Sequence, residues 1–316
     1  MLGVSILLGT LLTACSTDVK VSDQSRPSSG PDAAASAADV SASTDASNGG
    51  AMDVGFIEDA RAPDTGLAPI DAGPAPGPVV GTLENWCQGQ PADFSFFVTS
   101  MNAIWTLAGS QIDDLNGGFG GNFGGIAGAD YICQTIAQAT GFGHKRWRAF
   151  LSATDDGNGS PIHAIERIGT GPWYDSNGRL VATGLAGLAG DRPDGESASV
   201  LDLPDECGVP ISFIGDAHDT VTGSDRSGRV STTDRNFTCN DWTSSSAEVG
   251  YAPRGAPGVM IGHSFPRRGA TGNGANWASD HSTRGCSKGA VITQTQSTGT
   301  CIGCAGGFGG LYCFAE

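Results

Sequence analysis

The chain has 316 residues, enough for one or two folded domains. Its 33 acidic side chains outnumber the 17 basic ones, which gives a formal net charge of −16. A chain this acidic is repelled by phosphate backbones, so the charge argues against a nucleic-acid partner.

The first fifteen residues form an apolar run that ends in the sequence LTAC, whose cysteine is Cys15. This ending resembles a bacterial lipobox, in which the cysteine is lipidated and becomes the new N-terminus. No basic residue precedes the run, which departs from an ordinary signal peptide. The resemblance implies a lipoprotein signal peptide over residues 1–15, the alternative being a short signal peptide with a chance cysteine. The uncharged Ser16 that follows implies the outer membrane or the cell surface.

Residues 16–84 are rich in Ala, Ser, Asp, Gly and Pro and contain few large apolar side chains. Such a segment cannot bury enough apolar surface to offset the entropy lost on ordering. We therefore predict a disordered acidic tether here and a folded domain over residues 85–316. After the first fifteen residues, no stretch is long and apolar enough to span a bilayer.

Eight cysteines follow the signal sequence, an even number that predicts disulfide bonds in an exported protein. Two of them form a CxxC pair, Cys301 and Cys304. The chain has no second CxxC and no pair of histidines near this one, so we do not expect a zinc site there. The others are Cys87, Cys133, Cys207, Cys239, Cys286 and Cys313.

Short elements alternate along the domain. The patterns predict strands over 93–100, 146–153, 237–244, 258–265 and 310–316, a helix over 128–141 and a short helix over 161–169. A hairpin is expected over 171–183, with its bend at Ser176-Asn177-Gly178. Few helices, short strands and long loops favour an α+β domain joined by disulfides.

A glycine-rich run, GGFGGNFGG, precedes the predicted helix, and its first five residues recur at 306–310. A dinucleotide-binding loop would need glycine at position 123, which is Phe123, and would directly follow a strand. No Gly-Lys-Ser/Thr sequence is present either. We therefore expect the glycines to serve turns and close packing rather than phosphate binding.

The segment GGIAGADYICQTIAQATGFGHKRWRAFLSA resembles the opening of the endostatin fold, in which a cysteine-bearing helix precedes an Arg-Ala-Phe-Leu-Ser strand. VTGSDRSGR, CNDWTS and LYCFAE resemble later segments of that fold, in the same order. Endostatin belongs to the C-type lectin-like superfamily. A bacterial branch of secreted and lipid-anchored proteins resembles the chain more closely still, through FVTS, GPWY, CNDWTS and LYCF.

The resemblance implies a C-type lectin-like (endostatin-like) α+β fold with short mixed and antiparallel sheets, two helices and long loops. It implies a disulfide from the first helix to the last strand, Cys133 to Cys313. It also implies a bridge from Cys239 to Cys304 by spacing, with Cys301 or Cys286 as alternatives. It implies no partner for Cys87 or Cys207.

Sugar-binding C-type lectins hold calcium with a Glu-Pro-Asn or Gln-Pro-Asp loop, and this chain has neither. Asp241 is expected to form local hydrogen bonds, so we predict no tight calcium site. The acidic loop at 190–206 is expected to be a solvated surface loop. The candidate ligand-binding residues are Asn240, Asp241, Trp242, Trp277 and His281.

The five histidines form no zinc motif, and no Gly-x-Ser-x-Gly elbow is present. We therefore expect no metal, cofactor or catalytic residues. The sequence favours a lipid-anchored surface protein that presents a non-catalytic binding domain for an unidentified carbohydrate or extracellular protein. The alternative is a hydrolase of envelope or extracellular polymers on the same scaffold, since His263, Asp280 and His281 lie near serines in the sequence.

Overall fold

The structure is a computed structural model, and it describes residues 77, 79, 81–83, 86–87, 89, 91–112, 114–253, 256–267, 274–293 and 299–316. The predicted signal peptide with Cys15 and nearly all of the predicted tether lie outside these residues. Within the described part, no helix has the length and apolar character needed to cross a membrane. The described residues form a mixed α+β fold with four small sheets, as the pattern of short elements predicts.

The two ends of the domain meet in a three-stranded antiparallel sheet, which we call the terminal sheet. Its strands are β1 (Phe96–Val98), β11 (Tyr312–Ala315) and β2 (Trp147–Ala149), in the order β1-β11-β2. Each lies within a strand expected from the sequence. Aromatic side chains from these strands pack edge to face, with Phe96 and Phe314 4.8 Å apart between ring centroids, and build the core of this region.

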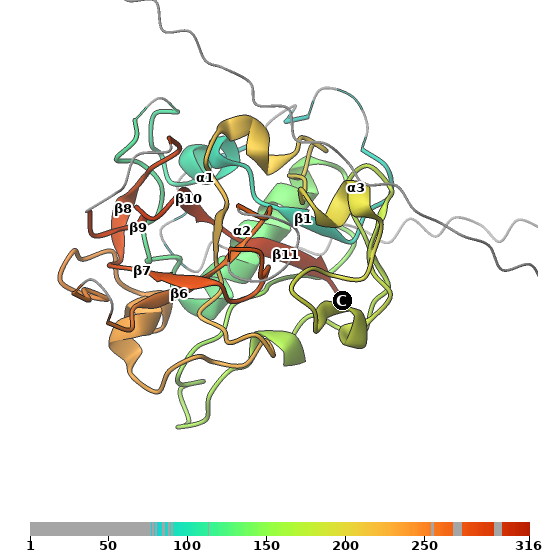
Figure 1. Cartoon of the computed structure of the whole chain (residues 1–316). Coiled ribbons are helices and arrows are strands. Elements are labelled where there is room, and N and C mark those ends of the chain that lie inside the picture. The colour runs from blue at the N-terminus through green and yellow to red at the C-terminus, as the bar shows by residue number, and fades with distance from the viewer. Residues whose placement is uncertain are drawn as a thin grey trace, which may run out of the picture. The chain divides into compact units, whose positions relative to one another are not determined.

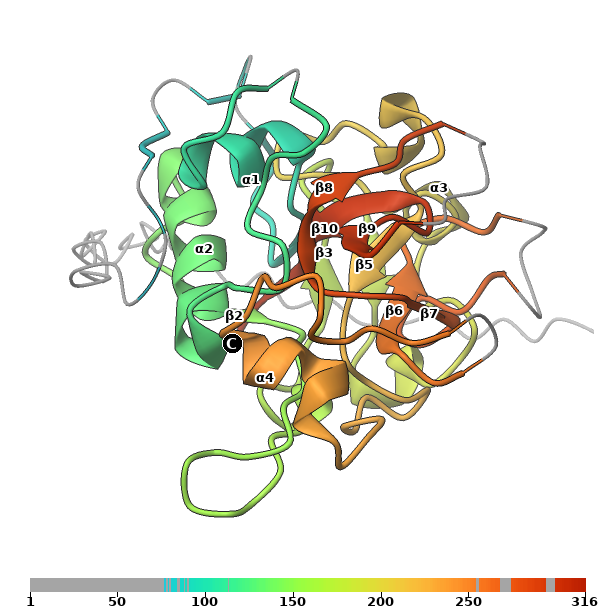
Figure 2. The ribbon, with the colours of Figure 1, turned by 90° about the vertical axis from the view of Figure 1, so that its left-hand side faces the viewer.

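Helix α2 (Gly125–Ala139) packs against β2 and confirms the predicted helix. Its buried residues include Ile132, Cys133 and Ile136, which recur at the spacing of one helix face. A shorter helix that the sequence patterns did not indicate, α1 (Met101–Leu107), begins at Ser100, whose hydroxyl accepts a hydrogen bond from the Ala103 amide. Figure 2 places α1 and α2 together on one side of the domain, with β5, β6 and β7 on the other.

A second sheet, which we call the central sheet, has four strands in the order β10-β5-β6-β7. The strands are β5 (Asp219–Val221), β6 (Val259–His263), β7 (His281–Thr283) and β10 (Gly307–Gly310). The pairs β5–β6 and β6–β7 are antiparallel, whereas β10 runs parallel to β5. Figure 1 shows β6 and β7 side by side, and β7 is the edge strand of this sheet.

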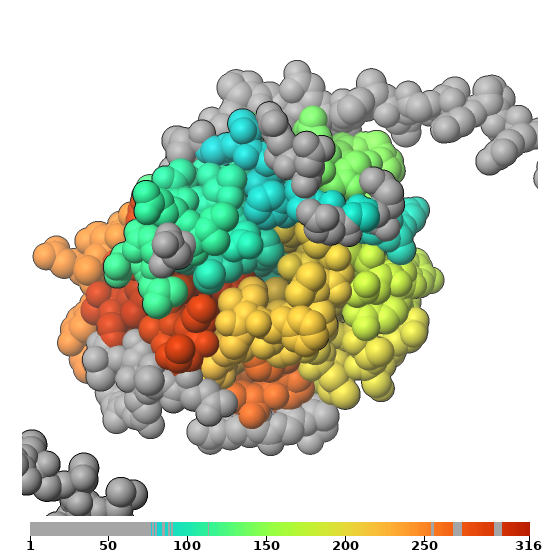
Figure 3. Space-filling view, turned by 90° about the horizontal axis from the view of Figure 1, so that it is seen from above, coloured from blue at the N-terminus to red at the C-terminus, as the bar shows by residue number. Residues whose placement is uncertain are grey.

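The remaining strands form two pairs. β3 (Trp173–Tyr174) and β4 (Leu180–Ala182) form the predicted hairpin, and β8 (Ser287–Ala290) pairs in parallel with β9 (Cys301–Gly303). The short helices are α3 (Ser197–Val200) and α4 (Cys239–Trp242) and the 3-10 turns η1 to η4 at Ala164–Glu166, Leu185–Leu188, Ile211–Ile214 and Arg235–Thr238. In Figure 3 the segment that contains α1, in teal, borders the gold segment that follows α3, so distant parts of the sequence share one surface.

Two local predictions were wrong. Residues 237–244 do not form a strand, because Cys239 to Trp242 adopt a left-handed turn with φ between 52° and 66°. This turn costs backbone energy, and it places Trp242 in the core, where the indole donates a hydrogen bond to the carbonyl of Ser152. The expected helix over 161–169 is reduced to η1.

Four disulfides link the described cysteines. Cys133 is joined to Cys313, the pair that the resemblance implied. The implied Cys239–Cys304 bridge is wrong, because Cys239 is joined to Cys286, one of the alternatives. Cys304 instead closes the CxxC with Cys301. The two cysteines for which no partner was expected, Cys87 and Cys207, are joined to each other.

The two GGFGG copies pack against different parts of the domain. In the first copy, a Cβ atom on Gly121 would lie 2.3 Å from the sulfur of Cys239. In the second, a Cβ atom on Gly306 would lie 2.3 Å from the His218 ring, and Gly306 has a φ of +132°. Both copies therefore allow a close approach that any side chain would block, as the sequence led us to expect.

Candidate metal centre

Three histidines and one aspartate converge on one face of the central sheet. His218, Asp219, His263 and His281 each offer one ligand atom, and these four atoms lie within 4.8 Å of one another. Among the described residues this is the one group of three or more such side chains that could hold a metal ion. Three members are buried, and the side chain of His281 is 34% exposed.

The strand register explains why these residues meet. Asp219 on β5 lies directly opposite His263 on β6, and Ile261, two residues before His263, lies opposite His281 on β7. Directly paired residues share a face, and residues two apart on one strand share it too. Asp219, His263 and His281 therefore project from the same side of the sheet, while His218 joins them from the position before β5.

The Nε2 atoms of all three rings surround one oxygen of Asp219. The Oδ1 atom lies 3.1 Å from His218 Nε2, 3.4 Å from His263 Nε2 and 3.3 Å from His281 Nε2. Zinc holds nitrogen and oxygen ligands at about 2.0–2.1 Å, which places the corners of a tetrahedron roughly 3.3 Å apart. The three separations match the edges of such a tetrahedron.

The opposite nitrogens of two rings face oxygen atoms. His218 Nδ1 lies 3.0 Å from Asp216 Oδ1, and His263 Nδ1 lies 2.9 Å from the Gly274 carbonyl oxygen. Metal-bound histidines commonly direct their second nitrogen at a carboxylate or carbonyl, which fixes the ring and the tautomer. A further carboxylate, Asp280, lies 3.5 Å from His263 Nε2.

Several of the converging atoms are buried without a hydrogen bond among the described residues. They are the Nε2 atoms of His218 and His263 and both carboxylate oxygens of Asp219. The nitrogens and the carboxylate are thus close without being aligned for hydrogen bonding. Buried polar groups nearly always have a partner, so this cluster points to a ligand that would supply one.

The charges of the cluster are strongly coupled. Burial alone would raise the pKa of Asp219, but the imidazoles of His263 and His281 hold that pKa well below its ordinary value. Burial lowers the pKa of His218 and outweighs the attraction of Asp219. At His281 burial also acts to lower the pKa, yet the contact with Asp219 raises it above its ordinary value. The cluster therefore favours an ionised carboxylate at its centre.

The second glycine-rich copy lies against this cluster. Gly307 on β10 pairs with Asp219, and the Asp219 amide donates a hydrogen bond of 2.9 Å to the Gly306 carbonyl. The ring of His218 packs on Gly306, where no side chain could fit. Part of the glycine repeat thus serves to seat two of the converging side chains.

Of the five candidate ligand-binding residues, only His281 belongs to the cluster. Asp241 is held by hydrogen bonds from Thr154 and Thr238 and by an ion pair with Arg235, the local role expected of it. The indoles of Trp242 and Trp277 are buried and donate to main-chain carbonyls. Asn240 is exposed on the left-handed turn.

The acidic loop at 190–206 does not gather its carboxylates. Asp194 accepts hydrogen bonds from Thr183, Asp202 from Ser212 and Glu196 from the Leu180 amide. The loop is also less solvated than expected, because Asp205 and Glu206 are buried at its end.

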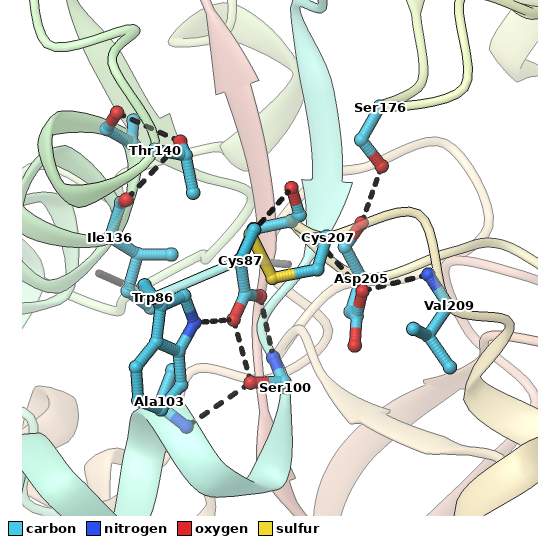
Figure 4. The surroundings of a disulfide bond; sticks show 12 residues. Trp86, Cys87, Ser100, Ala103, Ile136, Thr140, Ser176, Asp205, Cys207 and Val209 are labelled. Carbon is cyan, nitrogen blue, oxygen red and sulfur yellow. Dashed lines mark hydrogen bonds between the residues drawn. A yellow bond between two sulfur atoms is a disulfide. The ribbon is translucent and has the colours of Figure 1, made fainter. Parts of the chain in front are cut away.

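Glu206 lies beside the Cys87–Cys207 bridge and accepts hydrogen bonds from the Trp86 indole and from the amide and hydroxyl of Ser100. Figure 4 shows Trp86 and Ser100, the two residues that donate these hydrogen bonds, beside the Cys87–Cys207 disulfide. Burial raises the pKa of Glu206 above its ordinary value. Its hydrogen bonds are made within the fold, so this buried acid has a structural explanation that Asp219 lacks.

Two surface pockets of the described residues have linings that include none of the four converging side chains. A pocket of about 650 Å³ is lined by Ser212, Asp216, Phe265 and Arg267, among others, and so adjoins the cluster through Asp216. Its lining includes none of the four converging residues. A second pocket, of about 430 Å³, lies between the start of α2 and Asp155 and Asp156.

The members of this candidate metal centre have no recognisable spacing in the sequence, which therefore did not indicate it. His218 and Asp219 are adjacent, but His263 and His281 follow 45 and 63 residues after His218. The alternation in the predicted strand 258–265 already placed Ile261 and His263 on one face, which was the available signal. A scan against protein-family models and a search of curated proteins find no match for this chain.

Proposed function

We propose that the folded domain binds a divalent transition-metal ion of the zinc class through His218, Asp219, His263 and His281. The observation that carries this proposal is the convergence of three Nε2 atoms on one carboxylate oxygen. The Gly274 carbonyl, which accepts a hydrogen bond at Nδ1 of His263, favours the tautomer of this ring with the proton on Nδ1. In that tautomer Nε2 of His263 directs a lone pair at Asp219, and a cation between the two groups removes the repulsion.

The surrounding charges support a cation. Three carboxylates, those of Asp216, Asp219 and Asp280, lie within 3.5 Å of histidine nitrogens. Arg267 pairs with Asp216, which leaves the other two to be balanced chiefly by the histidines or by an ion. A divalent cation at the cluster would stabilise the ionised carboxylates and keep the imidazoles neutral.

The donor set selects the class of ion. Three imidazole nitrogens and one carboxylate oxygen suit zinc and neighbouring first-row metals, whereas calcium and magnesium favour oxygen-rich sites. Four protein ligands complete a tetrahedron and leave no position for a reacting water. The site therefore favours metal binding over catalysis, in line with the expected non-catalytic domain and against the hydrolase alternative.

The setting of this domain remains a proposal from the sequence. We infer a lipid anchor at Cys15 and a tether over 16–84 that hold the domain at the outer membrane or the cell surface. Loss of the protein from the membrane fraction in Cys15→Ala would support the anchor, and unchanged membrane retention would contradict it.

The resemblance to C-type lectin-like domains is supported by two features. The first and last strands of the domain pair with each other, and α2 is bridged to β11. These are the arrangements that the endostatin-like fold implies. A carbohydrate or extracellular protein ligand stays a prediction, with no site assigned to it.

Zinc titration of the purified protein tests the proposed function. We expect one zinc ion per chain, with affinity measured by competition with a chromophoric chelator. Loss of one direct ligand in His263→Ala should weaken binding at least about 100-fold, since even outer contacts of metal ligands contribute 10- to 100-fold. His144→Ala is the matched control, because His144 is exposed and lies in the loop after α2.

The proposal is wrong if the wild-type protein binds no zinc, or if His263→Ala binds it as tightly as His144→Ala does. Circular dichroism of both variants establishes that they are folded. Calcium in the same assay should give no tight binding, as the missing lectin loop predicts.

A further inference from the structure

The Cys301–Cys304 disulfide closes a turn that contacts both outer strands around the metal centre. On one side, the carbonyl of Cys301 accepts a 3.0 Å hydrogen bond from the hydroxyl of Thr283. Thr283 lies on β7, two residues after His281. The turn is therefore attached to the strand that supplies the one partly exposed histidine of the cluster.

On the other side, the same turn leads directly to two further ligands. Gly306 follows Cys304 by two residues, packs on the ring of His218 and accepts a hydrogen bond from the Asp219 amide. Gly303 accepts hydrogen bonds from the amides of Gly306 and Val291. The disulfide thus braces a short segment, residues 301–307, that touches His218 and Asp219 directly and His281 through Thr283.

This bridge differs from the others in what holds its sulfurs together. Cys133–Cys313 joins a helix to a strand that packing holds in place, and both cysteines are fully buried. Cys301 and Cys304 lie three residues apart in one turn, and Cys304 is half-buried. A thiol reagent therefore has access to this bridge through Cys304.

One contact of this bridge would also favour its reduced form. The Cys301 amide donates a hydrogen bond of 3.2 Å to the sulfur of Cys304. An amide donor stabilises a thiolate more than a disulfide sulfur, and CxxC cysteines are known for depressed pKa values and reversible oxidation. The same contact would favour the thiolate at Cys304 once the bridge is opened.

We propose that the Cys301–Cys304 pair is a redox switch that controls the metal affinity of the His218–Asp219–His263–His281 centre. A dithiol donor supplies two electrons and two protons, the bond between the two sulfurs breaks to give two thiols, and the donor becomes a disulfide. The freed turn no longer fixes Gly306 against His218 or Thr283 against Cys301. Metal affinity then falls. A disulfide acceptor that takes up two electrons and two protons from the two thiols re-forms the bond and restores the affinity. This inference rests on the proposed metal-binding function.

Reciprocity supplies a second consequence. If the disulfide form binds the ion more tightly, the bound ion must favour the disulfide form by the same factor. A tenfold difference in affinity corresponds to a shift of about 30 mV in the midpoint of a two-electron couple. Zinc should therefore make this bridge harder to reduce.

The test compares zinc affinity in the oxidised wild type and in Cys301→Ser/Cys304→Ser, which lacks the bridge and also lacks thiols that could bind zinc themselves. We expect about tenfold weaker binding in the double variant. Cys87→Ser/Cys207→Ser is the matched control, since it removes another half-buried bridge away from the cluster and should change affinity less than twofold. Circular dichroism checks that both variants fold.

A second measurement uses the wild type alone. Mass spectrometry after thiol labelling follows reduction of each bridge across a dithiothreitol series, with and without zinc. The Cys301–Cys304 midpoint should move by about 30 mV toward more reducing conditions when zinc is present.

The outcomes separate the two proposals. If the oxidised wild type binds no zinc, the proposed function itself fails. If the wild type binds zinc but the double variant binds it equally or more tightly, or the midpoint does not move, the switch is overturned and the metal centre stands.

Discussion

The terminal sheet and the central sheet use burial in opposite ways. The terminal sheet is packed with aromatic rings, covered by α2 and closed by the Cys133–Cys313 bridge. The central sheet buries His218, Asp219 and His263. Both ring nitrogens of His218, both carboxylate oxygens of Asp219 and Nε2 of His263 lack hydrogen bonds among the described residues. Burying such groups without hydrogen bonds costs free energy. The packing of the terminal sheet therefore stabilises the fold, whereas the buried polar groups of the central sheet are unfavourable unless a ligand binds them.

The largest expected effect tests the terminal sheet. The pair Cys133→Ala/Cys313→Ala removes a bridge with a sequence separation of 180. The loss of loop-closure restraint predicts a decrease of about 4–5 kcal/mol in the free energy of unfolding. Urea unfolding without reductant measures this decrease. If the comparison is sound, zinc affinity at low urea changes less than twofold, because the central sheet holds the ligands.

A decrease below about 1 kcal/mol would contradict the stabilising role given to the bridge. A large loss of zinc affinity in protein that remains folded would show that the two sheets are not independent.

A smaller effect separates the two glycine-rich copies. Gly121→Ala would force a methyl group against the sulfur of Cys239, and Gly306→Ala would force one against the ring of His218. Overpacking of this kind should lower the free energy of unfolding by about 1–3 kcal/mol in each variant. Zinc affinity should fall at least about tenfold in Gly306→Ala alone, since a displaced His218 loses its place among the ligands.

Thermal unfolding and zinc competition, measured side by side on the two variants, check this prediction. Equal zinc affinities in the two variants would show that the repeat at 306–310 does not seat the metal centre.

The smallest expected effect is on the pH dependence of stability, and it concerns Asp205, a buried aspartate whose pKa is shifted in the opposite direction to that of Asp219. Asp205 forms an isolated parallel β-bridge with Val98 of the terminal sheet. Burial and the nearby Glu206 raise the pKa of Asp205 to about 7. Asp219 in the central sheet has its pKa lowered instead. Because the folded state holds a proton on Asp205 more tightly than the unfolded state does, Asp205 contributes stability at low pH that is lost as pH rises through 7.

When pH falls from 8 to 6, the free energy of unfolding of the wild type should therefore increase by about 1 kcal/mol relative to that of Asp205→Asn. Urea unfolding at the two pH values gives this difference. If the free energy of unfolding of Asp205→Asn increases by as much as that of the wild type, the pH dependence comes from other groups.

The sequence by itself determined the elements whose signals are local. The apolar spacing around Cys133 indicated α2, and Ser176-Asn177-Gly178 indicated the β3–β4 hairpin, because helix faces and turns depend on neighbouring residues. The Cys133–Cys313 pair followed from a resemblance rather than from spacing. The disulfide-bonded α+β character was also readable from the pattern of short elements and the cysteine number.

Only the tertiary structure decided the cysteine pairs other than Cys133–Cys313 and the left-handed turn at 239–242. Disulfide connectivity depends on which strands meet, and the pairing of Cys239 with Cys286 could not be separated from its alternatives by spacing. The turn is favoured because it buries Trp242, a gain that no local propensity contains.

The metal centre is the clearest case of a feature that the sequence concealed. Its four side chains meet through the registers Asp219–His263 and Ile261–His281, which are set by pairing between strands far apart in the chain. Strand alternation can say which residues of one strand share a face, but it cannot say which strand lies alongside. That choice comes from packing of the whole domain, and it turns three ordinary histidines and one aspartate into a candidate site.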